Sequence, residues 1–507
     1  MPSLNWIGKD KVLNHHNEVP FRVLEKKYSY GDENAENMII HGDNLEALKS
    51  LLPKYEGKIK CIYIDPPYNT GNEGWVYNDN VNDPRIIKWL GEIVGKDGED
   101  LSRHDKWLCM MYPRLRLLHK LLSPKGAIFI SIDDNEQAFL KLLCDEIFGA
   151  SHFIAQAVWK RRASSAMAYR NVSIDHEYVL VYGKEETDSF YGIKKDYKGY
   201  SNPDNDPRGP WTTGDLTVGM TAEMRPNQYY DLVDPKTGNI YKPSASRVWS
   251  YIPESMDILI KENRIVFPKS IDKRPMKKRF LSELKSDQNP MSTWMTEVGL
   301  NTEGAKAIKQ IFGEAVFPYS KPKSLIEFLA SQIMDDGDIM LDSFAGSGTT
   351  AHAVLSMNQK DHKNRKFILI EMLDYAENIT AERIRRVISG HDVEETGGGF
   401  SFYELGEQLL LSNGDLNPKI NDEVIREYIW YMETRSAYLK SSVDENASFL
   451  GIHNDTAYYF AYEKDRQTVL DNDFLKTIKT RADAYVIYAD TCNLSDTKMN
   501  KYNITFK

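Results

Sequence analysis

The chain has 507 residues, 41% of them hydrophobic and 27% charged, and a formal net charge of −10 at pH 7. This length predicts roughly two to four domains, and the composition is ordinary for a soluble globular protein. No apolar run approaches the roughly 20 residues that span a bilayer, and the N-terminus does not resemble a secretory signal. We therefore expect a cytoplasmic protein with no membrane contact, and the acidic charge argues against unselective binding to nucleic acid.

The cysteines and histidines do not form metal-binding patterns. The 4 cysteines are scattered without a CxxC pair, and the 11 histidines show no HxxxH spacing. We expect free thiols in a reducing compartment and no metal site.

The first elements indicate a parallel sheet. Residues 1–37 are polar and irregular, and only 19–24 look ordered. Residues 38–43 predict a strand, 44–52 a helix capped by Asp43 or Asn44, and 61–64 a buried strand. Such a strand–helix–strand order is typical of parallel pairing.

Residues 62–70 read Ile-Tyr-Ile-Asp-Pro-Pro-Tyr-Asn-Thr and predict a rigid elbow after a strand. Pro66 and Pro67 each fix their own φ and lack an amide donor, so no helix can begin here. Open α/β sheets bind ligands at the carboxyl ends of their strands. Asp65 and a backbone carbonyl could accept hydrogen bonds from an amino group, while Tyr68 stacks on the ring that carries it. An ordinary strand-to-turn junction is the alternative, since Asp-Pro and Pro-Pro mark turns in any protein.

The α/β alternation continues and is then interrupted. Residues 71–100 predict a long mobile loop beside the candidate site. Helices at 103–122 and 136–148 alternate with strands at 127–132 and 177–182, which indicates a doubly wound α/β domain. Residues 190–300 lack this alternation and predict an inserted module of mixed structure.

Two basic clusters stand out, one at 160–162 and one at 269–279. A local basic face on an acidic protein suits contact with phosphates, although a solvated surface explains each cluster equally well. The candidate DNA contacts are Lys160, Arg161, Arg162, Lys273, Arg274, Lys277, Lys278 and Arg279.

The alternation resumes after residue 320. It predicts helices at 325–334, 351–357 and 378–388, and strands at 338–342 and 366–371. Three glycines at 397–399 mark a boundary, after which residues 400–507 predict a separate acidic α/β piece.

The segment Asp342-Ser-Phe-Ala-Gly-Ser-Gly348 lies between a predicted strand and helix, as a glycine-rich nucleotide loop does. Its two glycines permit a tight turn and close approach of a ligand to the backbone. It lacks both the lysine of a P-loop and the third glycine of a dinucleotide loop. Glu371 ends the next strand and could bind ribose hydroxyls. These features favour a nucleoside without a pyrophosphate, such as S-adenosylmethionine (AdoMet); the alternative is an ordinary glycine turn.

The motifs DPPY at 65–68 and FAGSG at 344–348 resemble those of DNA amino-methyltransferases. The resemblance covers about 38–182 and 315–390, and the catalytic motif precedes the cofactor motif, as in the permuted β group. The segments GDNLEALKSL, IDPPYNTG, KPKSLIEFLA, DSFAGSGTTAHAV and FYELGEQLL together resemble the modification (Mod) subunits of type III restriction–modification systems.

The resemblance implies a Rossmann-like AdoMet-dependent methyltransferase fold with a permuted, mixed and mostly parallel sheet. It implies an inserted α+β target-recognition domain and a C-terminal α/β domain. The expected ranges are 1–37 for an N-terminal extension, 38–184 for the catalytic half, 185–312 for target recognition, 313–395 for the AdoMet-binding half, and 396–507 for a C-terminal domain that docks a partner or a second copy.

The resemblance also implies roles for particular residues. Asp65, Pro66, Pro67 and Tyr68 would be catalytic, with Asp65 and the Pro66 carbonyl holding the amine of a flipped base and Tyr68 stacking on it. AdoMet would be held by Asp342, Phe344, Ala345, Gly346, Ser347, Gly348, Thr349 and Glu371. Lys321 or Ser324 would approach its methionyl end with Asp43 nearby, although a helix cap explains Asp43 and Ser324 equally well.

The implied reaction is methylation of N6 of adenine in duplex DNA, because an aspartate at the first motif position goes mainly with adenine in this family. The implied partners are double-stranded DNA, a second copy in a homodimer, and a restriction (Res) helicase–nuclease subunit. The alternatives are an N4-cytosine or stand-alone DNA methyltransferase, an RNA or protein amide methyltransferase, and a DNA-binding scaffold without catalysis.

Overall fold

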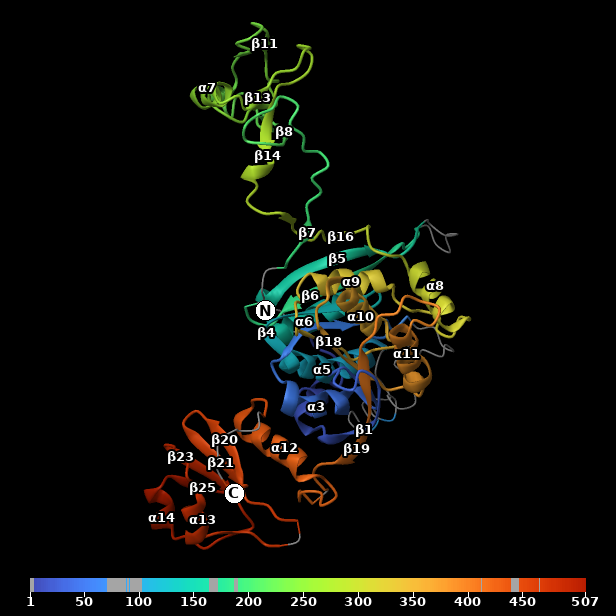
Figure 1. Cartoon of the computed structure of the whole chain (residues 1–507), viewed down its shortest axis with the longest axis vertical. Helices are drawn as coiled ribbons and strands as arrows, with labels where there is room; N and C mark the ends of the chain where they lie inside the picture. Colours follow the sequence, from blue (N-terminus) through green and yellow to red (C-terminus); the bar gives the residue numbers. More distant parts are fainter. Residues whose placement is uncertain are drawn as a thin grey trace. The chain divides into compact units, whose positions relative to one another are not determined.

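The computed structural model describes residues 4–70, 88, 91, 103–163, 172–186, 190–411, 413–438, 446–464 and 466–507 (Figure 1). The chain divides into a main unit, Met1–Phe190 with Ser292–Lys507, and an insert unit, Tyr191–Met291. The loop predicted at 71–100 lies outside the described residues, apart from 88 and 91. No helix in the described ranges is long and apolar enough to cross a membrane.

The described residues of the main unit form a ten-stranded sheet in the order β1-β19-β2-β18-β17-β3-β4-β6-β5-β16. In chain order its strands are β1 (Arg22–Gly31), β2 (Met38–His41), β3 (Ile59–Ile64), β4 (Leu122–Ile132), β5 (Phe153–Lys160), β6 (His176–Gly183), β16 (Trp294–Met295), β17 (Ile339–Asp342), β18 (Lys366–Glu371) and β19 (Gly399–Gln408). Pairing is parallel from β19 through to β4 and antiparallel at β1–β19, β4–β6 and β6–β5. The mixed α/β sheet predicted from the sequence is confirmed.

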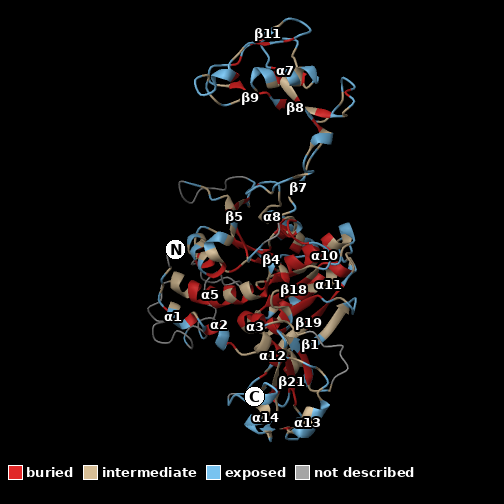
Figure 2. Ribbon diagram, turned by 90° about the vertical axis from the view of Figure 1, so that its left-hand side faces the viewer, coloured by how far each residue is buried: buried red, intermediate tan, exposed pale blue. Residues whose placement is uncertain are grey.

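Helices cover both faces of this sheet. The helices of the main unit are α1 (Lys9–Val12), α2 (His15–Glu18), α3 (Asn44–Tyr55), α5 (Arg103–Leu121), α6 (Gln137–Cys144), α8 (Asn301–Phe312), α9 (Lys323–Ser331), α10 (Thr349–Asp361), α11 (Glu382–Ser389), α12 (Asp422–Thr434), α13 (Asn472–Thr477) and α14 (Asp496–Lys501). Figure 2 shows α5 and α10 on opposite sides of the buried central strands. Because both faces are covered, Cys61–Ile64 is apolar at every position and at most 2% exposed.

Two strands of this sheet differ from the sequence prediction. Within residues 1–37, expected to be irregular apart from 19–24, Arg22–Gly31 forms β1, which pairs with β19 at the edge of the sheet. The polar run Glu25-Lys26-Lys27 lies on this edge strand, where charge is common because it opposes pairing with other chains. β5 was also not predicted, because its apolar residues are interrupted by Gln156 and end in a basic cluster.

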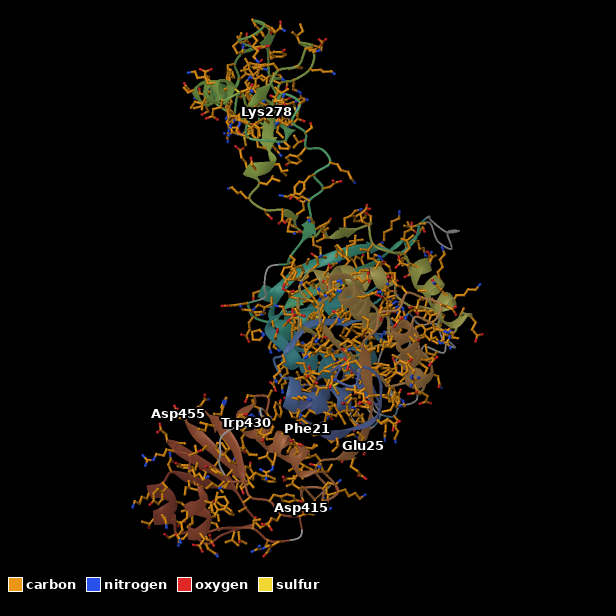
Figure 3. The ribbon with its side chains drawn as sticks, viewed as in Figure 1. Phe21, Glu25, Lys278, Asp415, Trp430 and Asp455 are labelled. Carbon is orange, nitrogen blue, oxygen red and sulfur yellow. The ribbon has the colours of Figure 1, made fainter. Side chains whose placement is uncertain are left out.

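The C-terminal part of the main unit carries its own sheet in the order β20-β21-β23-β25. Its strands are β20 (Phe449–His453), β21 (Thr456–Phe460), β22 (Val469–Leu470), β23 (Ala484–Tyr488), β24 (Thr491–Cys492) and β25 (Ile504–Phe506), with β22 paired to β24. Trp430 of α12 belongs to a hydrophobic cluster against which Phe21 also packs, and Figure 3 labels both residues. β19 belongs to the main sheet although it lies beyond residue 396, so the domain boundaries stay a prediction.

The insert unit is a small β-rich module with one helix in its described residues. Its elements are β7 (Ile193–Lys194), β8 (Trp211–Asp215), β9 (Thr217–Val218), β10 (Leu232–Val233), β11 (Ile240–Tyr241), β12 (Val248–Trp249), α7 (Pro253–Lys261), β13 (Ile265–Val266), β14 (Met276–Phe280) and β15 (Gln288–Asn289). Leu216, Trp249 and Met256 are among the fully buried residues of its core. The unit lies inside the range 185–312 predicted for target recognition, whereas β16 and α8 at the end of that range belong to the main unit.

Candidate active site

The two predicted motifs meet at one edge of the main sheet. β17 and β3 are parallel neighbours, with Met340 opposite Cys61 and Leu341 opposite Ile62. From β17 the chain continues through α10 to β18 on one side, and from β3 through α5 to β4 on the other. Strands whose connections diverge in this way leave a crevice at their carboxyl ends, where α/β proteins bind ligands. Asp65 and Asp342 stand at those two ends.

Five polar side chains from different segments meet beside the elbow after β3. We call them the elbow cluster: Asp65, Tyr68, Arg161, Glu177 and Lys321. Lys321 Nζ lies 2.8 Å from both Asp65 Oδ1 and Asp65 Oδ2, and 3.5 Å from Glu177 Oε2. It also lies 4.8 Å from the centroid of the Tyr68 ring. The Tyr68 hydroxyl donates to Glu177 Oε2 at 3.0 Å, and Arg161 Nη1 donates to Glu177 Oε1 at 2.9 Å. Glu177 thus connects the ring, the ammonium and the guanidinium.

In the elbow cluster, burial and the neighbouring opposite charges shift the pKa values of Asp65 and Lys321 in opposite directions. Burial raises the pKa of Asp65, and the Lys321 ammonium opposes that rise. Burial lowers the pKa of Lys321, but Asp65 and Glu177 outweigh it and the net shift is upward. The Lys321 ammonium therefore favours the ionised form of Asp65, which burial disfavours. The Asp65 side chain keeps 23% of its accessible surface, so a ligand in the crevice can reach it.

Contacts behind the elbow hold its backbone. Trp107 Nε1 donates to the Pro67 carbonyl at 2.7 Å. Asn69 is fully buried in the left-handed region at φ 57°, and its amide donates to the Arg103 carbonyl at 3.1 Å and to Glu136. Asparagine tolerates this conformation better than most residues. The hydrogen bond from Trp107 thus engages the Pro67 carbonyl, and the contacts of Asn69 hold the backbone that follows.

The loop after β17 requires both of its glycines. Gly346 and Gly348 have φ of 51° and 77°. A Cβ at Gly346 would lie 3.2 Å from the Phe317 ring, and one at Gly348 would lie 3.2 Å from the Thr380 carbonyl oxygen. Larger residues would thus meet both backbone strain and crowding. The two glycines therefore let the loop pack closely against Phe317 and Thr380.

Two buried carboxylates shape this loop. Asp342 accepts from the Phe344 N–H at 3.0 Å and from the Thr350 hydroxyl at 2.5 Å. Glu371 accepts from the Gly346 N–H at 2.8 Å and from the Leu373 N–H at 3.0 Å. Burial raises the pKa of each carboxyl to about 7. Tyr375 and the Met372 N–H also donate to Glu371, so a ribose hydroxyl would have to share or displace one of these four donors.

The remaining predicted cofactor residues have local partners. Asp43 caps α3, accepting from the N–H groups of Leu45 at 2.9 Å and Glu46 at 3.1 Å. The Ser324 hydroxyl donates to Glu303 at 2.8 Å and accepts from the Gly299 N–H at 3.0 Å. Lys321 binds Asp65 rather than a residue of the glycine loop. The capping role that the sequence allowed for Asp43 is confirmed.

Three of the predicted DNA contacts are engaged elsewhere. Lys278 is 2% exposed and pairs with Asp204 and Asp206 inside the insert unit, where Figure 3 labels it. The interpretation of Lys278 as a phosphate contact is therefore wrong, because the alternation of β14 turns it inward. Arg161 binds Glu177, and Lys277 donates to the Tyr251 hydroxyl at 2.6 Å. The exposed members are Lys160, Arg162, Lys273, Arg274 and Arg279.

Sequence reasoning missed Glu177, Ser320 and Arg383. Glu177 is an acid at the start of a strand whose other residues are nearly all apolar, a combination that could have been noticed. Ser320 directly precedes the KPKS segment, and its hydroxyl lies 2.9 Å from the Ser347 hydroxyl in the glycine loop. Arg383 lies among other arginines of α11, and nothing in the sequence marks it as the buried one.

The chain belongs to the DNA methylase family, whose model matches residues 59–382. It is 36% identical over 388 residues to the StyLTI Mod subunit of a type III restriction–modification enzyme from Salmonella typhimurium, covering 72% of this chain and 57% of that protein. It is 31% identical to the EcoP15I Mod subunit of Escherichia coli, covering 73% and 64%. It is 32% identical to the type II methyltransferase M.KpnI of Klebsiella pneumoniae, covering 69% and 84%.

The resemblance to type III Mod subunits is thereby confirmed. The matched region nevertheless spans only about three fifths of the length of the first two relatives, at 57% and 64%.

Proposed function

We propose that this chain transfers a methyl group from AdoMet to N6 of a flipped adenine in duplex DNA, as the modification and specificity subunit of a type III restriction–modification system. The observation that carries the proposal is the adjacency of Asp65 and the glycine loop at the diverging strands β3 and β17. One motif suits an amine and the other a nucleoside, so a single crevice can hold acceptor and donor. Membership of the DNA methylase family supports the same reaction.

The residues around the glycine loop fit AdoMet. Gly346 and Gly348 allow the tight turn from β17 into α10, and Glu371 is a carboxylate beside this loop that ribose hydroxyls would share with its present donors. Asp342, Phe344, Ala345, Ser347 and Thr349 complete the loop that would hold it. When bound, AdoMet supplies an electrophilic methyl group. The Rossmann-like methyltransferase fold proposed for residues 38–184 and 313–395 agrees with this use of the sheet.

The elbow would activate the acceptor. An exocyclic amine is a weak nucleophile because its lone pair is delocalised into the ring. Asp65 and the Pro66 carbonyl would accept its two hydrogen bonds and favour a pyramidal nitrogen with an available lone pair. The Pro67 carbonyl is already bound by Trp107, which leaves Asp65 and Pro66 for this task. Tyr68 would stack on the flipped base, and correct positioning would supply much of the rate enhancement.

Lys321 has a defined task in this scheme. It binds both oxygens of Asp65, so the amine of the base must share or displace one of these contacts. Its charge keeps Asp65 ionised, which matters because only a carboxylate offers acceptors on both oxygens. Glu177 would keep Lys321 and Tyr68 in place while the base enters.

The remaining assignments follow from this role. The insert unit would read the DNA sequence, with Lys273, Arg274 and Arg279 among its phosphate contacts and with Lys160 and Arg162 adding contacts from the main unit. The C-terminal part would dock a second copy or a restriction subunit, and the protein would act in the cytoplasm, where the DNA is. Adenine is preferred to cytosine because Asp65 stands at the first motif position.

A stand-alone methyltransferase is the second candidate. The match covers 84% of the type II methyltransferase M.KpnI but only 57% of the StyLTI Mod subunit. Co-purification with a helicase–nuclease subunit expressed from the same cells would favour the type III role, whereas its failure would favour the stand-alone enzyme.

The direct test measures transfer of tritiated methyl groups from AdoMet to duplex DNA, RNA and protein. We expect transfer to duplex DNA alone, and methylation-sensitive sequencing should place it on adenine N6. Asp65→Ala should abolish transfer while calorimetry shows nearly unchanged AdoMet binding. Transfer to RNA or protein, or an Asp65→Ala variant that transfers methyl groups at the wild-type rate, would overturn the proposal.

A further inference from the structure

Arg383 is a buried cation whose hydrogen bonds all go to neutral groups. It lies on α11 and is 0% exposed. Its Nη1 donates to the hydroxyls of Ser347 at 2.8 Å, Thr349 at 2.8 Å and Ser320 at 3.2 Å, and to the Ser347 carbonyl at 3.3 Å. Its Nε is buried without a partner, and no carboxylate within the described part of the chain pairs with it.

The charge of Arg383 persists despite this burial. Burial lowers the pKa of the guanidinium to about 9, which leaves it protonated at neutral pH. His352 Nδ1 lies 3.3 Å from Nη2, and the pKa of His352 is well below its usual value because of burial first and Arg383 second. His352 is therefore neutral and accepts a hydrogen bond without compensating the charge. An uncompensated buried charge is unfavourable, so an anion nearby would be stabilising.

The guanidinium points at the beginning of a long helix. α10 runs from Thr349 to Asp361, and its first residue supplies one of the hydroxyls that Arg383 binds. The N–H groups at a helix N-terminus carry a partial positive charge and favour anions. Two independent features, the dipole of α10 and the unpaired charge of Arg383, thus favour a negative group at the same end of the glycine loop.

Arg383 donates into a ring of three hydroxyls, two of which belong to the glycine loop and the start of α10. Ser320 Oγ is 2.9 Å from Ser347 Oγ and 3.1 Å from Thr349 Oγ1, and the last two are 3.3 Å apart. These three side chains are 3–6% exposed. A guanidinium can only donate, so each hydroxyl oxygen accepts from it, while the hydroxyl protons are shared within the ring and with the Lys321 carbonyl, which lies 3.4 Å from Ser320 Oγ. A hydroxyl that turned away from its present acceptor would donate to an anion that Arg383 itself does not touch.

We propose that Arg383 is a positioning residue for the carboxylate of the cofactor's methionyl end, acting through the hydroxyls of Ser320, Ser347 and Thr349. This inference rests on AdoMet as the cofactor. The carboxylate is the anionic group of AdoMet, whose sulfonium and ammonium groups are cationic. Arg383 would therefore distinguish ligands that carry this carboxylate from those that lack it.

The test compares two ligands, AdoMet and decarboxylated AdoMet, by calorimetry on the full chain. In Arg383→Gln we expect affinity for AdoMet to fall about 10- to 100-fold, because the carboxylate loses a nearby buried positive charge and the hydroxyls lose their common donor. Affinity for decarboxylated AdoMet should change less than about twofold. Arg386→Gln is the matched control on the same helix; its side chain binds Glu382 and the Ile311 carbonyl, and both affinities should stay at the wild-type level.

Each outcome discriminates. If Arg383→Gln weakens both ligands equally, Arg383 only supports the loop and the inference is overturned. If the wild-type chain binds neither ligand, AdoMet is not the cofactor, and the proposed function fails before the role of Arg383 is reached. If Arg383→Gln does not fold, as melting would show, Thr349→Val removes one hydroxyl of the ring. It should weaken AdoMet alone by about 3- to 10-fold, and an equal loss for both ligands would again overturn the inference.

Discussion

Lys321 Nζ lies 2.8 Å from each carboxylate oxygen of Asp65, although 256 residues separate the two in the chain. Asp65 follows β3 and Lys321 lies two residues before the start of α9, so this ion pair joins the two segments that carry the DPPY and KPKS motifs. The pair lies in the crevice rather than in the core, since Asp65 and Lys321 keep 23% and 11% of their side-chain surface. A change in this ion pair should therefore be measurable as a change in methyl-transfer activity.

Lys321→Met should move the acidic limb of the activity profile to higher pH. Burial raises the pKa of Asp65 and Lys321 opposes the rise, so removal of the ammonium raises that pKa further. Activity needs the ionised carboxylate and is lost as pH falls through its pKa, so the variant should lose activity at a higher pH than wild type. Profiles of kcat between about pH 5 and pH 9 would measure this.

Two controls accompany this variant. Lys321→Arg keeps the positive charge and should keep the acidic limb close to its wild-type position. Lys323→Met removes a neighbouring ammonium that binds Ser356 and Glu327 instead, and it should leave the limb unchanged. An unshifted limb in Lys321→Met would show that Asp65 does not depend on Lys321.

Glu177→Gln should impair the reaction without weakening cofactor binding. The substitution keeps the shape of the side chain but removes the charge that Lys321 and Arg161 face. We expect the free energy of unfolding to fall by about 1–3 kcal/mol, as for a weakened buried contact between charged groups. Methyl transfer should fall about 10- to 100-fold, because Tyr68 and Lys321 lose the carboxylate charge that they share.

Chemical denaturation, single-turnover transfer and AdoMet calorimetry together measure these effects. Glu185→Gln, which changes an exposed acid just beyond β6, is the control and should match wild type. Transfer at the wild-type rate in Glu177→Gln would mean that the elbow needs no support from β6.

AdoMet affinity should fall as pH is lowered from about 8 to about 6. Burial raises the pKa of Glu371 to about 7, so the carboxylate is ionised above that pH and gains a proton below it. A protonated oxygen loses acceptor capacity, which the Gly346 N–H and a ribose hydroxyl both require. For one coupled proton the loss is at most about tenfold per pH unit.

Calorimetry on wild type and Glu371→Gln at both ends of this range would separate the contributions. The variant should bind more weakly at high pH and show a flatter dependence, although Asp342 also has its pKa raised to about 7 and would retain part of the slope. If Glu371→Gln kept the full pH dependence of AdoMet affinity, a group other than Glu371 would be responsible for that dependence.

The exposed basic residues of the insert unit should carry phosphate contacts, whereas Lys278 should not. Simultaneous replacement of Lys273, Arg274 and Arg279 by alanine should weaken DNA binding and reduce the slope of log affinity against log salt by up to about 3. The variant should melt like wild type, because these side chains are exposed. Fluorescence anisotropy over a series of salt concentrations measures both affinity and slope.

Lys278→Met tests the opposite expectation. Lys278 pairs with the exposed Asp204 and the buried Asp206 inside the insert unit, so its loss should remove a cation from both acids and leave Arg208 to pair with Asp206. Limited proteolysis should then cut the insert unit faster than in wild type. If the Lys278→Met insert were stable and its slope of log DNA affinity against log salt were reduced, Lys278 would be a phosphate contact after all.

The central strands and both motifs could be predicted because their signals are local. A strand buried on both faces is apolar throughout, as Cys61–Ile64 is, and prolines or glycines next to it restrict the following turn. The edge strand β1 has no such signal, since a strand exposed on one side can carry charge at successive positions. β5 was missed for a similar reason.

The contacts that assemble the site could not be predicted from one sequence. Glu177 reaches Tyr68 across 109 residues, and Arg383 reaches Ser320 across 63. Lys278 looks like any member of a basic cluster until the structure brings Asp204 and Asp206 beside it. Local patterns indicate which residues can perform chemistry, whereas their partners depend on the path of the chain between strands.

Ser320 and Lys321 are consecutive residues that serve different parts of the site. The hydroxyl of Ser320 contacts Ser347 and Thr349 in the glycine loop, and the ammonium of Lys321 holds Asp65 in the elbow. A ligand that displaces one of these side chains would therefore disturb the contact made by the other. Such coupling is reciprocal: the factor by which DNA changes the affinity for the cofactor equals the factor by which the cofactor changes the affinity for DNA. Neither ligand would then bind independently of the other, and this dipeptide, rather than either motif, would carry their cooperativity.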